Sequence, residues 1–159
     1  MSNTKNNKIE HLWTILAGSS SVDNESNSFS IFNILEEITI QANGQSMNPN
    51  EKKNISIPFE IISMWKRVND DKEDIISDIK VGLFDPKGEL VQEMGYKMEM
   101  KSQHQKMRMR VKANGIAVTK PGEYNFSIKV KNNNDFIEVG RTPLVVKMPV
   151  SVDFNLLKK

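Results

Sequence analysis

The chain has 159 residues, 22 of them basic and 20 acidic, so its formal net charge is +2 and the overall balance demands no nucleic-acid or membrane partner. Hydrophobic residues make up 38% and charged residues 26%, which is too apolar for a disordered chain and too polar for a membrane protein. The absence of cysteine excludes a disulfide framework, thiolate zinc sites and cysteine nucleophiles. We therefore expect a soluble protein of a reducing compartment, the cytoplasm.

The length predicts one domain, placed over residues 9–148 between a flexible N-terminal tail (1–8) and a C-terminal extension (149–159). The apolar run 12–17 is too short for a signal peptide. No stretch approaches the roughly 20 apolar residues of a transmembrane helix, so we expect no membrane span.

In the first half of the chain, β-forming residues predict a strand over 11–17, ended by a serine-rich loop at 18–21. Residues 29–41 predict two strand pieces, with a bend or bulge at Leu35-Glu36-Glu37. A long polar loop over 41–54 precedes a strand that begins at Ile55 and extends toward Val68. Pro58 within it predicts an edge position or a bulge, because proline cannot donate to a strand ladder.

In the second half, a strand over 75–84 ends in the turn sequence Asp85-Pro86-Lys87-Gly88. Residues 90–100 and 107–111 predict a hairpin with its tip at 102–105. The segment 120–124 leads into an alternation over 126–130, which with residues 136–148 predicts a second hairpin, kinked at Gly140 and Pro143. No amphipathic helix and no βαβ alternation is present. The pattern predicts an all-β fold, an immunoglobulin-like antiparallel β-sandwich of about seven to nine strands.

Two resemblances support this architecture. The segment Pro121-Gly122-Glu123-Tyr124-Asn125-Phe126 resembles the entry to the penultimate strand of immunoglobulin-like domains, which implies a tyrosine corner at Tyr124. Phe126 stands where antibody-type domains have a cysteine. Longer stretches (21–23, 30–38, 85–91 and 121–130) resemble an uncharacterised family of bacterial and phage immunoglobulin-like, C2-like β-sandwich domains, a resemblance that implies a fold and no activity.

Large apolar side chains at alternate positions are interpreted as core. This applies to Trp13 and Trp65 and to five methionines: Met94, Met98, Met100, Met107 and Met109. The alternatives are an adaptable, methionine-lined partner surface and a Trp65 that binds carbohydrate or protein.

Basic residues gather on the hairpin predicted over 90–112. Six of them form a candidate binding face on its outer side: Lys97, Lys101, Lys106, Arg108, Arg110 and Lys112. Such a face suits phosphates or an acidic protein. A charged face that merely keeps the sheet soluble is the alternative, and Glu99 interrupts the row.

Carboxylates at the predicted loops suggest a calcium site of the C2-like kind: Asp23, Asp70, Asp71, Glu73, Asp74 and Asp85. The spacing matches no calcium-loop motif and Lys72 lies within the acidic run, so ordinary solvated loops are favoured. His11 and His104 are the only histidines, and each is assigned a structural or solvated role.

No catalytic residue, cofactor site or metal site is predicted, since no serine elbow or phosphate-binding glycine loop is present. The leading functional hypothesis is a non-enzymatic protein-interaction or scaffolding module, which docks on a protein partner or self-associates through an exposed strand. Nucleic-acid or anionic-ligand binding through the basic face is the first alternative. Calcium-dependent binding is the second.

Overall fold

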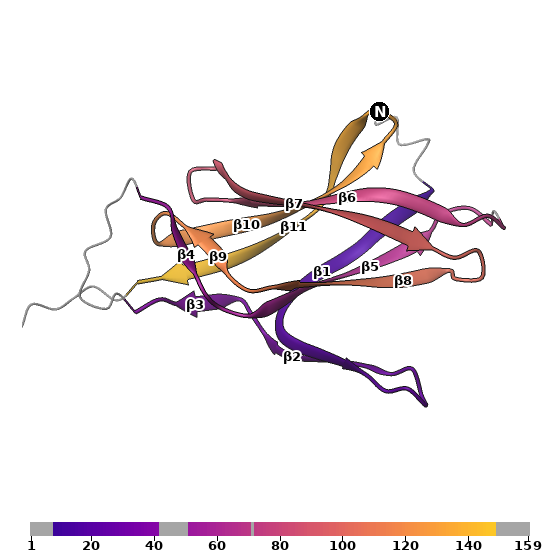
Figure 1. Cartoon of the computed structure of the whole chain (residues 1–159), viewed down its shortest axis with the longest axis horizontal. Coiled ribbons are helices and arrows are strands. Elements are labelled where there is room, and N and C mark those ends of the chain that lie inside the picture. The colour runs from indigo at the N-terminus through magenta and orange to yellow at the C-terminus, as the bar shows by residue number, and fades with distance from the viewer. Residues whose placement is uncertain (1–7, 42–50, 71, 149–159) are drawn as a thin grey trace, which may run out of the picture.

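The computed structural model describes residues 8–41, 51–70 and 72–148, and these form eleven strands and no helix (Figure 1). Three sets of strands pair. Sheet A has the order β2-β1-β5-β8, sheet B the order β3-β11-β10-β6-β7, and β4 pairs with β9 alone. The bounds are β1 Ile9–Val22, β2 Phe29–Ile34, β3 Glu37–Thr39, β4 Lys53–Ile55, β5 Phe59–Arg67, β6 Ile75–Phe84, β7 Leu90–Met100, β8 Lys106–Ala113, β9 Ile116–Val118, β10 Gly122–Asn132 and β11 Asp135–Lys147. No helix of the described ranges could cross a membrane.

The core lies between sheets A and B, because alternate residues of their long strands point to the same interior. Tyr124, Phe126 and Ile128 of β10 are buried, and the ring of Phe126 meets Phe59 of β5 edge to face, with 5.9 Å between ring centroids. The predicted all-β, immunoglobulin-like sandwich is confirmed. The described strands exceed the expected seven to nine because β3, β4 and β9 are three-residue strands too short to predict from alternation.

The five methionines and Trp65 belong to the core or pack against it, and Trp13 does not. Met98 and Met100 are buried, and Met94, Met107 and Met109 pack against the same core, as predicted. Trp65 is fully buried, whereas Trp13 stays partly exposed and outside the core cluster, so the core assignment of Trp13 is wrong. A register shift between His11 and Trp13 is the reason, because a bulge there breaks the alternation of β1.

The predicted hairpin over residues 90–112 is also wrong. β7 pairs with β6 in sheet B, and β8 pairs with β5 in sheet A, so the chain between them crosses from one sheet to the other. Strict alternation predicts the same inward-facing residues whether β7 pairs with β8 or with β6. It therefore cannot identify the neighbouring strand. The tight hairpin lies one strand earlier, where the turn at Asp85 joins β6 to β7.

Three further expectations need correction or refinement. Residues 18–21 are not a loop, because β1 continues to Val22 and pairs with β2. Pro58 lies just before β5, which is an inner strand and not an edge. The expected bend at residues 35–37 is present, and there the chain leaves sheet A for sheet B.

The last strand is irregular at Gly140, as the sequence indicated, whereas its pairing with β10 stays regular at Pro143. The register between β10 and β11 shifts beside Gly140, and a Cβ at that position would lie 2.4 Å from Cε1 of His11. Glycine is thus required by the close approach of the His11 ring. Pro143 lies beyond the part of β11 that pairs with β3, which leaves its missing N–H without consequence for that ladder.

The tyrosine corner is present. The buried Tyr124 hydroxyl accepts hydrogen bonds from the N–H groups of Thr119 (2.9 Å) and Lys120 (3.1 Å) and donates to the carbonyl of Lys120 (2.7 Å). Thr119 Oγ1 also donates to Asp85 Oδ2 (3.2 Å). The corner is therefore connected to the β6–β7 turn, and it fixes how β9 leads into β10.

Asp85 organises that turn. Its Oδ1 accepts hydrogen bonds from the N–H groups of Lys87 (2.8 Å) and Glu89 (3.0 Å). Burial acts to raise the pKa of Asp85, but these donors and the Thr119 hydroxyl outweigh it and lower the pKa below its ordinary value. Asp85 thus has a structural role as a charged carboxylate.

Candidate functional site

The six candidate basic residues do not form one surface. Lys97 lies on β7 and Lys101 just beyond it, beside sheet B, whereas Lys106, Arg108, Arg110 and Lys112 lie on β8 at the edge of sheet A. The sandwich separates the two groups because the connection between β7 and β8 is a crossover. The combined six-residue face is therefore not formed, and nucleic-acid or anionic-ligand binding through the four β8 residues stays a prediction.

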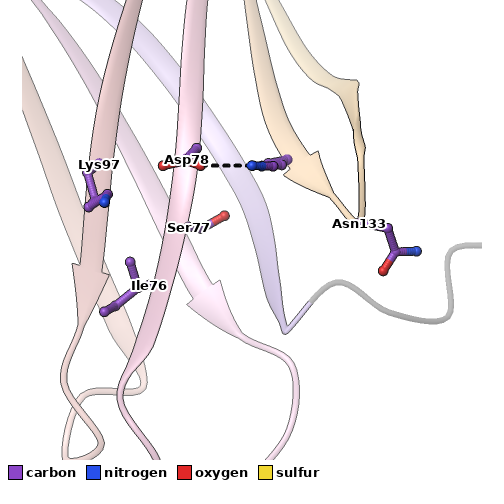
Figure 2. A pocket seen from close by; sticks show the side chains of 6 residues that line it. Ile76, Ser77, Asp78, Lys97 and Asn133 are labelled. Atoms are coloured by element: carbon purple, nitrogen blue, oxygen red, sulfur yellow. Dashed lines mark hydrogen bonds and ion pairs between the residues drawn. The ribbon is translucent and has the colours of Figure 1, made fainter.

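The lysines near β7 lie among acidic groups. Lys101 contacts Asp74 at 3.1 Å and also contacts Glu99, and these two carboxylates raise the pKa of Lys101. Lys97 lines a shallow hollow of about 240 Å³, seen in Figure 2, where Asp78 pairs with Lys131 at 3.4 Å. Much of the positive charge on this side is therefore locally balanced.

The two arginines of β8 contact the projecting end of the β1–β2 hairpin, which we call the arm (residues 18–34). The Arg108 guanidinium lies 4.6 Å from the centroid of the Phe29 ring and donates to Asn27 Oδ1 at 3.1 Å. Arg110 donates to Ser20 Oγ at 3.1 Å, and Ser20 in turn donates to the buried Glu60. These arginines hold the arm against the outer side of sheet A.

Removing these contacts is expected to release the arm without unfolding the sandwich. In Arg108→Ala with Arg110→Ala, we expect faster amide hydrogen exchange over residues 18–34 and a change in the free energy of unfolding of about 1 kcal/mol or less, because the contacts are near the surface. Lys106→Ala with Lys112→Ala removes the same charge from the same strand and is the control. Equal protection of the arm in both double variants would contradict the assignment.

Strand β2 of the arm is an edge of sheet A, paired only with β1 (Figure 1). Its sequence, Phe-Ser-Ile-Phe-Asn-Ile, contains no charge and no proline. Phe32 is 49% exposed and Ile34 is 58% exposed. The strand therefore presents unpaired backbone groups beside apolar side chains, the combination that allows another strand to pair.

A groove of about 380 Å³ lies where β2 ends. Its apolar lining comes from β1, from the bend after β2, and from β11, with Leu16, Leu35 and Val145 as examples. Glu36 and Glu123 contribute the carboxylates of the lining. Sequence reasoning missed this groove because its walls are 20 to more than 100 residues apart in the chain and meet only where β1 passes β11.

Three of the candidate calcium ligands, Asp23, Asp74 and Asp85, accept local hydrogen bonds. Asp23 accepts hydrogen bonds from the N–H groups of Glu25 and Ser26, and Asp74 accepts one from Ser102. Asp74 and Asp85 flank opposite ends of β6, a distance of roughly 30 Å for an extended strand of this length. No group of three metal-ligating side chains occurs within the described ranges, and Asp71 lies outside them.

His11 and His104 have different surroundings. The His11 ring packs edge-on against Trp65 (5.0 Å between centroids), and its Nε2 lies 2.7 Å from Thr14 Oγ1. Partial burial lowers the pKa of His11, because desolvation disfavours the charged ring. The structural role predicted for His11 is confirmed, and His104 is an exposed loop residue whose backbone carbonyl accepts a hydrogen bond from Arg67.

Comparison with known proteins shows no family for this chain. No family model and no curated protein matches the sequence. Among solved structures, the chain is similar to Bacteroides uniformis beta-glucuronidase (16% identity, TM-score 0.39), over 55% of this chain and 11% of that one. It is also similar to the C-terminal domain of Wzt (11% identity, TM-score 0.37), over 65% and 74% of the respective chains. The chain thus spans about a tenth of the glucuronidase, and neither likeness indicates a function.

Proposed function

We propose that this protein is a non-enzymatic interaction module that binds a partner protein by adding a strand of that partner to the edge of β2. The observation that carries the proposal is the uncharged, half-exposed edge strand β2 on the arm. Strand addition of this kind takes its affinity from main-chain hydrogen bonds and its specificity from alternate side chains. The lack of cysteine suits action in a reducing compartment such as the cytoplasm.

The other described sheet edges are less suited to pairing. β8 carries four basic side chains, and β7 carries Glu93, Lys97 and Glu99. β3 has three residues and begins with Glu37. Charged and very short edge strands resist pairing with other chains, whereas β2 has neither protection. The contrast favours β2 as the binding edge.

The anchoring of the arm also supports the proposal. Arg108 and Arg110 hold one side of the hairpin against sheet A, which pre-organises the edge and reduces the entropy lost when a partner binds. Phe32 and Ile34 remain exposed for a partner to cover. An arm held in this way suits a docking element.

The test is capture of a partner by the full chain and by surface variants. We expect Phe32→Glu with Ile34→Glu to reduce the recovery of a specific partner from native lysate by about tenfold or more, because charge on the pairing edge opposes strand addition. The control is Ile76→Glu with Leu90→Glu, since Ile76 (64% exposed) and Leu90 (50%) are equally open positions on sheet B. Light scattering on the same samples checks for self-association through the edge.

Equal recovery by the two double variants would exclude β2 as the binding edge. A wild-type protein that stays monomeric and captures no specific partner would overturn the proposal as a whole.

A further inference from the structure

The groove begins where the free edge of β2 stops. Ile34 is the last residue of β2 and belongs to the lining, together with Leu35 and Glu36 of the bend that follows. A strand laid along β2 would therefore reach the groove at its Ile34 end.

The interior of the groove is apolar. Leu16, which is nearly fully buried, belongs to the lining, and the other apolar lining residues are Ile15, Ile34, Leu35, Pro143 and Val145. A volume of about 380 Å³ is at the lower end of the range for ligand pockets, which begins at about 300 Å³. The groove thus suits one large apolar side chain and not an extended cofactor.

The carboxylates of the groove are available to a basic ligand. Glu36 makes no ion pair with any described residue, and among these residues Glu123 has only a 3.4 Å contact with the side-chain amide of Asn125. The neighbouring Glu37, in contrast, pairs with Lys147. Two carboxylates around an apolar interior favour a cationic group next to an apolar one, and they oppose phosphates.

We propose that the groove is a specificity pocket, which receives an apolar side chain from an extended segment of the partner protein while a neighbouring Lys or Arg of that segment pairs with Glu36 and Glu123. This inference rests on the proposed function and names the kind of strand that β2 accepts: alternating β-forming residues that end in a large apolar residue and a basic one. The edge of β2 supplies main-chain pairing, and the groove selects the sequence.

The test uses the full chain and a fluorescein-labelled peptide, Thr-Val-Thr-Val-Thr-Leu-Lys-Lys, followed by fluorescence anisotropy. We expect this peptide to bind at least about tenfold more tightly than the same peptide ending in Leu-Glu-Glu or in Ser-Lys-Lys. Its affinity should decrease as the salt concentration is raised from about 50 to about 200 mM, because salt screens ion pairs at a surface. Equal affinity for the three peptides would overturn the inference.

Charge reversal in the protein provides the second measurement. Glu36→Lys with Glu123→Lys should reverse the preference toward the Leu-Glu-Glu peptide. The control, Glu10→Lys with Glu51→Lys, changes the net charge equally at exposed positions outside the groove and should keep the original preference. A reversal in the control as well would show that only net charge matters and would overturn the inference.

Two outcomes separate this inference from the proposed function. If Phe32→Glu with Ile34→Glu abolishes partner capture while the peptides show no charge preference, strand addition at β2 holds and the groove assignment is wrong. If the charge preference is present but a backbone N-methylated peptide binds as well as the parent, the groove binds side chains and strand addition is wrong.

Discussion

Replacing Arg67 by methionine is expected to reduce the free energy of unfolding by about 3 kcal/mol. Arg67 is only 2% exposed at the end of β5, and its guanidinium donates to the carbonyls of Glu73 (3.0 Å), Lys101 (3.1 Å), Met100 (3.4 Å) and His104 (3.3 Å). These carbonyls belong to the segment that precedes β6, to the last residue of β7 and to the loop that follows β7. Methionine fills similar space but leaves the carbonyls without this donor, and each buried unsatisfied acceptor costs about 1–3 kcal/mol.

Urea unfolding followed by tryptophan fluorescence measures the change, since the buried Trp65 reports on the core. Lys66→Met removes an exposed cation from the neighbouring position and is the matched control. Arg67→Lys should fall between the two, because a single ammonium group cannot reproduce the planar fork of donors. A loss in Arg67→Met no larger than in Lys66→Met would contradict the assigned role.

Tyr124→Phe is expected to cost about 2 kcal/mol of stability. The substitution keeps the buried ring but removes the hydroxyl that serves two N–H donors and one carbonyl at Thr119 and Lys120. Tyr96→Phe is the control, because within the described part of the chain the Tyr96 hydroxyl makes a hydrogen bond only to the sulfur of Met94, at 3.2 Å. The difference between the two variants in urea unfolding isolates the corner.

The tyrosine corner is connected to the β6–β7 turn through Thr119, and this energetic coupling can be measured with the same Tyr124→Phe variant. Thr119 contacts both Tyr124 and Asp85, so Tyr124→Phe and Asp85→Asn should be non-additive in a double-mutant cycle. Strict additivity would show that the corner and the turn act separately.

Sequence patterns identified much of the local structure. The Asp85 turn, the tyrosine corner and the bend after residue 34 are short-range features whose residues lie within a few positions of one another. The inward-facing methionines followed from alternation, which reports the side of a strand and requires no knowledge of its neighbours. Trp13 is the exception, because a bulge between it and His11 cannot be recognised from alternation.

The candidate site was less accessible to sequence reasoning. Six basic residues were assigned to one hairpin, yet the chain crosses between sheets after Met100, so the lysines of one sheet and the arginines of the other separate. The role of Arg108 and Arg110 in holding the arm depends on contacts with residues about 80 to 90 positions earlier. No local pattern contains that information.

The sequence by itself determined that this protein is an all-β sandwich, which side of most strands faces its core, and where the Asp85 turn and the tyrosine corner lie. These properties depend on period-two alternation and on the backbone preferences of a few turn residues. Only the tertiary structure decided which strands are neighbours, that β2 is left as an uncharged edge, and that β1 and β11 enclose a groove beside it. Strand pairing brings together residues distant in the chain, and alternation is the same for every choice of partner strand.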